Sequence, residues 1–512
     1  MTEQVDVLII GSGPSGSTYA RTIGDAVPTA RILMVEAGPV IPGIRGDHTQ
    51  NMTDEERAAA QLLTQGPDEG LERAQALSDI AEGLDPSLEF RHTILPGLFF
   101  LDPRPALEDG EVGLPAASMA SGVGGMGIHW GISCPRPSQS ERTPFIPTAE
   151  LDAALDHAEQ LLGVRKWDVP GTGLAEAIRA AQAEEFDGPG LTPVGFMPAA
   201  YRWEDGRLRF SGTGMILGDI EETVPGFELR AQTLAKRVIV EDGVAVGAAL
   251  EDRVSGETYE VRAHHVVVCA DGLRTPQVLF ASGVRPPALA HYLNEHFQVS
   301  AFGALTDDFA PERFDNDPEH VGYVIVPFSD ERPMQGGILP LMNSPYRLAV
   351  AGQEGAERLT VFAWYGAKDI QYCDRIEFSE TETDFYGMPK MTIHYSRTEK
   401  DLQTIEQLKQ NARRSADRVG GLAAEPELAA GGSSLHYHGT VRMGAVDDGT
   451  SVCDQHLKVW GVDNLYVGGN GVIPTATATN PTLTIVALAW RAANQIALQL
   501  NERVGTAATA AR

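Results

Sequence analysis

The first apolar run of the chain, Val5–Ile10, is interrupted only by Asp6 and is followed directly by the glycine-rich stretch Gly11–Gly16. A run that is apolar on both faces is typical of a buried parallel strand. Residues Ser17–Ile23 can form a helix, and a second apolar run, Arg31–Val35, ends at Glu36. This order of strand, glycine turn, helix, strand and acid predicts a dinucleotide-binding unit at the start of the chain.

Each residue of this unit has a physical role in holding a dinucleotide. Gly11 permits the tight turn, Gly13 lets the backbone approach a pyrophosphate, and Gly16 lets the helix pack on the strand. The N-terminus of the helix attracts phosphate charge. Glu36 follows Gly16 by 20 residues, which places its carboxylate to accept hydrogen bonds from an adenosine ribose.

Further apolar runs lie far from this unit. Phe227–Arg253, His264–Ala270 and Asn464–Val467 predict strands that complete the dinucleotide domain. Residues 290–425 contain extended stretches that predict an antiparallel sheet on the substrate side. Residues 54–84 are rich in Ala, Glu and Gln, which favours helix. They could act as a lid within 50–90 or form an ordinary solvated pair of surface helices, and both interpretations remain open.

Near the C-terminus, a histidine lies in a glycine-containing segment and an asparagine precedes a long apolar helix. His436 can accept a hydroxyl proton because the ordinary pKa of histidine is about 6.5. Asn480 can hold the same oxygen by hydrogen bonding without competing for the proton. We expect Asn480 to cap the helix with Pro481 in its first turn, so that the positive helix end stabilises a reduced cofactor. Such a pair suits alcohol oxidation beside a hydride acceptor.

His438 lies on the same side as His436 if the segment is extended. An HxH pair can bind a metal, but the sequence offers no third ligand nearby, so we expect no metal site. A supporting role and a substrate-facing role both remain open for His438.

Composition indicates a large folded enzyme. The chain has 512 residues, of which 43% are hydrophobic and 21% charged, so we expect a packed globule with two intertwined domains. The formal net charge of -30 argues against nucleic acid and anionic membranes as partners, because both attract basic surfaces. The charge identifies no substrate, and a homo-oligomer is compatible with the sequence.

The cysteines and the apolar segments bear on the cellular location of the protein. Cys134, Cys269, Cys373 and Cys453 are far apart and form no CxxC motif, which favours free thiols in a reducing compartment. The residues before the first strand lack the pattern of a signal peptide. Polar residues interrupt the apolar run Leu483–Leu500, which argues against a membrane span. We therefore expect a cytoplasmic protein.

Three motifs occur in a characteristic order: GSGPSG with Glu36, the block Gly124–Trp130 (GGMGIHW), and the pair His436 and Asn480. Together they resemble the glucose-methanol-choline (GMC) family of flavin oxidoreductases. The GGMGIHW block, Asp384–Pro389 (DFYGMP) and Gly471–Thr475 (GVIPT) are similar to pyranose oxidases, especially the bacterial branch that includes C-glycoside 3-oxidases.

The resemblance implies FAD as cofactor and His436 and Asn480 as catalytic residues. It implies that FAD is held by Gly11, Gly13, Ser15, Gly16, Glu36, Gly124, Gly125, Met126, His129, Asn470, Pro481 and Thr482. His129 matches a histidine that bonds covalently to the flavin in fungal pyranose oxidases, but the two neighbouring threonines of that motif are replaced by Ile128 and Gly131. Non-covalent FAD is therefore slightly favoured, and a covalent link through His129 stays open. Trp130 and His438 are candidate substrate contacts.

The expected fold combines α/β and α+β parts. A Rossmann-like FAD-binding domain is assembled from residues 1–160, 205–290 and 426–512. A substrate-binding domain, made of residues 161–204 and 291–425, contains an antiparallel sheet covered by helices.

The expected reaction is oxidation of a secondary hydroxyl of a sugar or glycoside to a keto-sugar, with O2 or a quinone reoxidising the flavin. The favoured position is C3 of a C- or O-glycoside, and the alternative is C2 of a free pyranose. Two other classes remain open. A hydroxynitrile-lyase-like enzyme would bind FAD without cycling it, and a nicotinamide-dependent dehydrogenase would use the same N-terminal motif.

Overall fold

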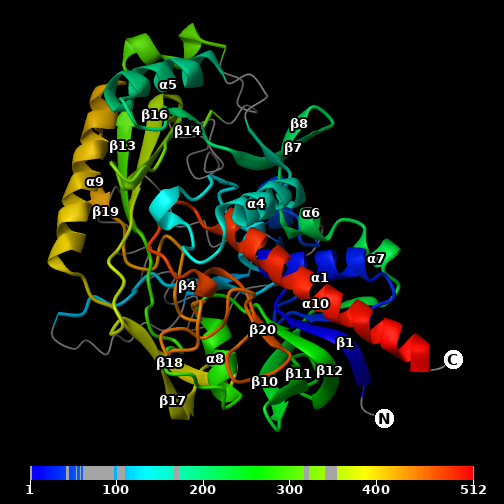
Figure 1. The fold of residues 1–512 in the computed structure, drawn as a ribbon. Coiled ribbons are helices and arrows are strands. Elements are labelled where there is room, and N and C mark those ends of the chain that lie inside the picture. Colours follow the sequence, from blue (N-terminus) through cyan, green and yellow to red (C-terminus); the bar gives the residue numbers. More distant parts are fainter. Residues whose placement is uncertain are drawn as a thin grey trace.

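The computed structural model describes residues 3–41, 45–53, 55–57, 59–60, 97–100, 110–166, 172–315, 322–340 and 355–510. Two large sheets organise these residues (Figure 1). Most of the segment expected as a lid, 50–90, lies outside the described residues, so its role stays a prediction. Among the residues described, no helix combines the length and the apolar character needed to cross a membrane.

The first sheet is built around the predicted N-terminal strand. In the order of the sheet, its strands are β10 (Thr233–Glu241), β11 (Val244–Asp252), β12 (Thr258–Val268), β1 (Glu3–Ile10), β2 (Ile32–Val35) and β9 (Phe227–Arg230), and β20 (Leu465–Val467) also pairs with β12. β1 runs parallel to both β12 and β2. The first half of β12 pairs with β11, and its last residues pair with β20. One long strand therefore joins a parallel core to an antiparallel extension.

Helices from distant parts of the chain pack beside this sheet. The helices are α1 (Pro14–Ala26), α4 (Thr148–Leu162), α6 (Thr213–Leu217), α7 (Ile220–Thr223), α8 (Arg274–Ala281) and α10 (Thr482–Ala510). α10 packs on both α1 and α4, and α8 packs on β10. Figure 1 shows α1 and α10 side by side, with both chain ends near one edge of the sheet.

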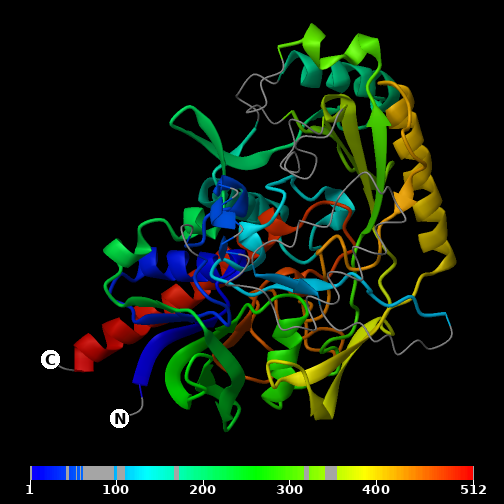
Figure 2. The ribbon, with the colours of Figure 1, turned by 180° about the vertical axis from the view of Figure 1, so that it is seen from behind.

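The second sheet is antiparallel throughout. In order, its strands are β19 (Glu427–Leu428), β13 (Phe297–Ala304), β16 (Leu359–Gly366), β15 (Met334–Pro340), β14 (Val324–Val326) and β6 (Gly195–Phe196). Helices α9 (Glu399–Asp417) and α5 (Gly173–Phe186) pack against it, and Figure 2 shows α9 along its outer side.

Successive side chains on these strands point to opposite faces of the sheet, one packed in the core and the other facing a cavity. On β13, Phe297 and Val299 enter the core beneath the helices, whereas Gln298 lines a cavity on the opposite face. On β16, Phe362 and Trp364 join the core in the same way. The period-2 pattern therefore gives this sheet a helix-covered side and a side that faces a cavity.

The remaining elements are short. The other strands form three small sheets. The first pairs β17 (Arg375–Thr383) with β18 (Pro389–His394), and the second pairs β3 (Leu98–Phe100) with β4 (Ser118–Ala120). The third has the order β5 (Val164–Arg165), β7 (Ala199–Glu204) and β8 (Arg207–Phe210). The 3-10 turns are η1 (Thr49–Asn51), η3 (Gly125–Ile128), η4 (Gln139–Glu141), η5 (Asp307–Phe309), η6 (Pro311–Arg313), η9 (Ala356–Arg358) and η10 (Asn470–Val472).

The predicted fold class is confirmed, since a Rossmann-like sheet and a separate antiparallel sheet are both present. The domain boundaries expected from the sequence stay a prediction.

Candidate active site

A cavity of about 460 Å³ is lined by residues from both sheets. One part of its wall follows the carboxyl ends of β1, β2 and β12, where ligands of open α/β sheets bind. The predicted site residues that line it are Gly11, Gly13, Ser15, Glu36, Gly125, Met126, His129, Trp130, His436, Asn470, Asn480 and Thr482. Gly16, Gly124, Pro481 and His438 are not part of the lining.

The glycine turn after β1 leaves backbone open to this cavity. Gly11 has a φ of 102°, and a Cβ there would lie 2.3 Å from the carbonyl oxygen of Cys269. A Cβ on Gly16 would lie 2.0 Å from the oxygen of Gly11. A Cβ on Gly13 would instead meet nothing closer than the oxygen of Gly124 at 4.0 Å. Gly11 and Gly16 are thus required by close packing, and Gly13 presents its backbone to the cavity at the N-terminus of α1.

Glu36, at the end of β2, is buried at this end of the cavity. Its carboxylate accepts hydrogen bonds from the Ser12 hydroxyl, at 2.7 Å, and from the Gly38 backbone N–H, at 3.0 Å. Burial raises the pKa of Glu36, while these hydrogen bonds act in the opposite direction. The turn and the acid are therefore fixed relative to each other, as a ribose site requires.

The DFYGMP block lies beside the same end of the cavity. Tyr386 lines it and donates a hydrogen bond to the Ser121 hydroxyl at 2.7 Å. The Arg274 guanidinium lies over the Tyr386 ring, 4.7 Å from its centre. A flat aromatic side chain and a cation therefore bound the part of the cavity nearest Glu36.

The GGMGIHW block forms the 3-10 turn η3. Gly124 has a φ of 105° and donates its N–H to the Ser12 hydroxyl at 2.9 Å, which ties this block to the first glycine turn. His129 directly follows η3 and lines the cavity. The Trp130 indole N–H donates to the backbone oxygen of Ser211 at 2.8 Å, so its ring, rather than its N–H, is offered to a ligand.

His436 lines the cavity and lies next to a second histidine. Its Nδ1 is 2.7 Å from Nε2 of His296, and the two rings meet edge to face with 4.6 Å between centres. Burial lowers the pKa of His436 to about 4. The imidazole is therefore neutral near pH 7 and able to accept a proton.

His438 lies on the same side of the segment but deeper. It is fully buried, does not line the cavity, and its ring centre is 6.5 Å from that of His296. This position favours the supporting role over substrate contact. In the part of the chain that the structure describes, no group of three or more His, Cys, Asp or Glu residues could hold a metal ion.

Asn480 lines the cavity, but the helix after it starts later than expected. α10 begins at Thr482. The first backbone hydrogen bond of this helix runs from the Ile485 N–H to the carbonyl oxygen of Pro481, at 3.0 Å. Asn480 therefore lies one residue before the cap, and its Oδ1 accepts a hydrogen bond from Gln335 instead. The prediction that Asn480 caps the helix is wrong by one position, and its side-chain oxygen is hydrogen-bonded to Gln335 from β15 instead.

Two buried carboxylates hold the loops that carry His436 and Asn480. Glu141 accepts hydrogen bonds from the N–H groups of Ala478 and Thr479, at 2.8 and 2.9 Å. Glu295 accepts them from the N–H of Gly432, at 2.6 Å, and from the Ser434 hydroxyl, at 2.6 Å. Sequence reasoning did not identify His296, Gln335, Glu141 or Glu295. The Ser138–Glu141 capping spacing was a signal for Glu141, although only of local structure.

The cavity fits a dinucleotide that carries a redox-active ring. The open backbone at Gly13 can approach a pyrophosphate, and the start of α1 favours its charge. Oδ1 of Asn470 is buried in the cavity wall without a hydrogen-bond partner among the described residues, so a bound donor group can satisfy it. The same lining includes the neutral imidazole of His436 and the amide of Asn480. These features define an oxidoreductase of the dinucleotide-dependent class.

Known proteins resemble this chain over nearly its whole length. Two models of the GMC oxidoreductase family match residues 138–298 and 375–489. A C-glycoside 3-oxidase from Microbacterium trichothecenolyticum is 43% identical, covering 96% of this chain and 96% of that protein. Another from Arthrobacter globiformis is 42% identical, covering 97% and 95%. A pyranose 2-oxidase from Tricholoma matsutake is 30% identical, covering 96% and 93%. The crystal structure of a pyridoxine 4-oxidase from Mesorbium loti matches the fold with a TM-score of 0.63 at 15% identity, covering 96% of this chain and 99% of that chain.

The chain belongs to the GMC oxidoreductase family. It is therefore an oxidoreductase that acts on CH–OH groups with FAD as its cofactor, as the resemblance of its motifs implies.

Proposed function

We propose that the protein oxidises a secondary hydroxyl of a glycoside to a ketone, at C3 of the sugar ring. The observation that carries the proposal is one cavity that joins the dinucleotide cradle at Gly13 to His436 and Asn480. The substrate class is supported by the two C-glycoside 3-oxidases, which are 42–43% identical over almost the full chain.

The ADP half of FAD would be held by Gly13, Ser15, the start of α1 and Glu36, and the flavin by Gly125, Met126 and the start of α10. When bound, FAD supplies the hydride acceptor. Nδ1 of His436 lies 2.7 Å from His296, which leaves Nε2 as the ring nitrogen that can face the substrate hydroxyl and accept its proton. Oδ1 of Asn480 is taken by Gln335, so its Nδ2 donates a hydrogen bond to the substrate oxygen and stabilises the developing negative charge.

The test is anaerobic mixing with substrate, followed by the bleaching of oxidised flavin. Wild-type protein should bleach with aryl C-glycosides, and His436→Ala should bleach about 10²- to 10⁴-fold more slowly because the general base is lost. His291→Gln, which lies outside the cavity lining, is the matched control. Equal rates in His436→Ala and wild type would contradict the assignment of the base. A lyase or a nicotinamide-dependent enzyme would give no bleaching with any substrate.

The alternative is oxidation at C2 of a free monosaccharide, as the 30% identical pyranose 2-oxidase suggests. NMR of the product distinguishes a 3-keto from a 2-keto sugar, and a comparison of glycosides with free glucose distinguishes the substrate classes. Reoxidation rates with O2 and with a soluble quinone identify the better acceptor.

The favoured form of the cofactor is non-covalent FAD. The threonines that accompany the covalent motif are replaced here by Ile128 and Gly131. Acid precipitation tests this, because non-covalent flavin remains in the supernatant and covalent flavin stays with the polypeptide. If flavin stays with wild-type protein and is released from His129→Ala, the link is covalent.

A further inference from the structure

His296 and His436 form a buried pair, and the position of the proton between them bears on the proposed reaction. His296 immediately precedes β13 and is fully buried. Its Nε2 lies 2.7 Å from Nδ1 of His436, a normal hydrogen-bond distance between two ring nitrogens. A hydrogen bond between two neutral imidazoles needs one proton, so one nitrogen of the pair is the donor and the other the acceptor.

The direction of this hydrogen bond decides whether His436 can act as a base. If Nδ1 of His436 carries the proton, Nε2 has a free lone pair for the substrate. If His296 donates instead, Nε2 of His436 is protonated and cannot accept the substrate proton. Nδ1 of His296 is buried and makes no hydrogen bond among the described residues, so the contact with His436 is the one that involves its ring nitrogens. A proton on its Nδ1 leaves Nε2 of His296 as the acceptor.

We propose that His296 is a positioning residue, whose Nε2 accepts a hydrogen bond from Nδ1–H of His436 and thereby holds His436 in the tautomer that can take the substrate proton at Nε2. The inference rests on the proposed function, in which His436 is the general base.

Burial, followed by the neighbouring His436 and His438, lowers the pKa of His296 well below its usual value, so its ring is neutral near pH 7. The other titratable group whose ring lies against His296 is Tyr365, 4.9 Å away between ring centres. The carboxylate of the adjacent Glu295 is engaged with Gly432 and Ser434. A neutral His296 can therefore accept the hydrogen bond from Nδ1–H of His436.

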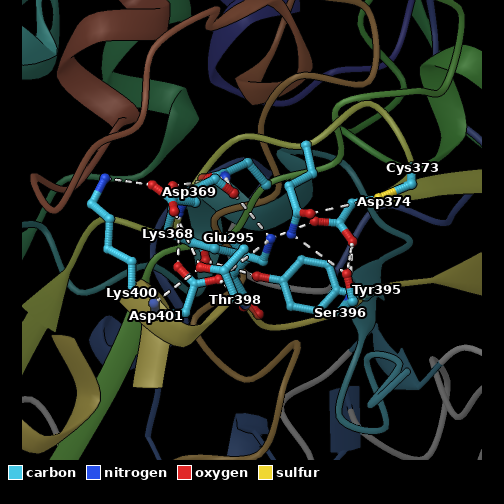
Figure 3. A network of polar contacts seen from close by, with 12 residues as sticks. Glu295, Lys368, Asp369, Cys373, Asp374, Tyr395, Ser396, Thr398, Lys400 and Asp401 are labelled. Carbon is cyan, nitrogen blue, oxygen red and sulfur yellow. Dashed lines mark hydrogen bonds and ion pairs between the residues drawn. The ribbon is translucent and has the colours of Figure 1, made fainter. Parts of the chain in front are cut away.

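The backbone on both sides of the pair is fixed. Asn294 exchanges two backbone hydrogen bonds with His438, at 2.7 and 3.0 Å. The Asn294 side chain donates to the backbone oxygen of Lys368 at 3.1 Å. Tyr395 donates its hydroxyl to the backbone oxygen of Glu295 at 3.0 Å (Figure 3). Because the segment before β13 is held from several directions, His296 enters the pair already oriented, which is the requirement for a residue that acts through another.

Two substitutions with the same chemistry but different reach test the proposal. In His296→Gln the amide oxygen can occupy the place of Nε2 and still accept the hydrogen bond. In His296→Asn the side chain reaches only as far as Nδ1 and cannot. We expect His296→Gln to keep anaerobic flavin reduction within about tenfold of wild type. We expect His296→Asn to slow it by about 10²- to 10⁴-fold, with the apparent substrate Kd of the same titration nearly unchanged.

A spectroscopic readout does not depend on activity. In holoenzyme with ¹⁵N-labelled histidine, Nδ1 of His436 should show the shift of a protonated ring nitrogen and Nε2 that of an unprotonated one, with the signals assigned by loss in His436→Ala. Finding Nε2 protonated in wild type overturns the proposal without any variant at His296.

The outcomes separate this inference from the proposed function. If both His296 variants reduce flavin at the wild-type rate while His436→Ala is slow, the positioning role is wrong and the base assignment stands. If His436→Ala is as fast as wild type, the base assignment itself fails. A slow His296→Asn beside an active His296→Gln supports the positioning role.

Discussion

The side-chain nitrogen of Gln335 donates a hydrogen bond to Oδ1 of Asn480, with 2.8 Å between the two atoms. Gln335 is fully buried on β15 of the second sheet, and Asn480 precedes α10 beside the first sheet. The contact therefore joins the two halves of the molecule at the cavity. It also fixes which end of the Asn480 amide faces the substrate, because an amide whose oxygen is engaged can offer only its N–H groups.

Replacing Gln335 with Glu should reverse this arrangement. A carboxylate at this position accepts hydrogen bonds and cannot donate them, so the Asn480 amide is expected to turn and direct its oxygen into the cavity. We expect anaerobic flavin reduction to slow by about tenfold or more, the equivalent of roughly one hydrogen bond. Gln335→Met removes the donor without attracting the amide nitrogen and should have a smaller effect. A Glu variant as fast as wild type would show that the orientation of Asn480 does not matter.

Glu141 should be important for stability as well as for the position of Asn480. Its carboxylate accepts hydrogen bonds from Ala478 and from Thr479, including the Thr479 hydroxyl at 2.6 Å. Loss of these buried charge-assisted hydrogen bonds in Glu141→Ala should lower the free energy of unfolding by about 3 kcal/mol or more. Urea titration measures this.

The control for Glu141 is Glu176→Ala. Glu176 forms a half-exposed pair with Arg179 one helical turn away, so its loss should cost less than about 1 kcal/mol. Similar losses in the two variants would contradict a special role for Glu141.

Local sequence patterns predicted the cofactor-binding part of the cavity better than the residues that contact His436 and Asn480. The turn at Gly11, Gly13 and Gly16 could be predicted because the steric demands on glycine and the helix that follows lie within one short segment. His436 and Asn480 were identified by residue type and motif order. His296 is separated from His436 by 140 residues, so no spacing rule could pair them. The partner of the Asn480 side-chain oxygen, Gln335, comes from another sheet and could not be predicted from a local pattern for the same reason.

Lys368 and Lys400 offer a matched comparison of buried and exposed charge (Figure 3). The Lys368 side chain is fully buried, forms an ion pair with Asp374, and lies 4.0 Å from Asp401. Lys368→Met leaves two buried carboxylates without their cation, which should cost about 3–5 kcal/mol of the free energy of unfolding. Lys400 is 75% exposed in its pair with Asp369, so Lys400→Met should change stability by less than about 1 kcal/mol.

The comparison is made by urea unfolding near pH 7. A stability loss in Lys368→Met no larger than that in Lys400→Met would contradict the importance of the buried network.

The buried histidines should make the protein lose stability as the pH falls below about 6.5. The affected residues are His48, His265 and His436, whose pKa burial lowers to about 4, His438, whose pKa is lowered to about 3, and His296. In the pH range between the unfolded and the folded pKa, the unfolded chain binds protons that the folded protein does not. The free energy of unfolding therefore decreases as pH falls through this window.

His438 offers the clearest single test because it is completely buried and lies outside the cavity lining. Lowering its pKa from the usual 6.5 to about 3 corresponds to roughly 4–5 kcal/mol over the whole window, at about 1.4 kcal/mol per pH unit. His438→Gln removes this titration, so its unfolding free energy should depend less steeply on pH between about 6.5 and 4, by up to one proton. The measurement is a set of urea titrations at several pH values, with the m-value checked at each. His291→Gln is the control on the same fold, and a slope for His438→Gln equal to that of wild type would mean that His438 has the same pKa in the folded and the unfolded protein.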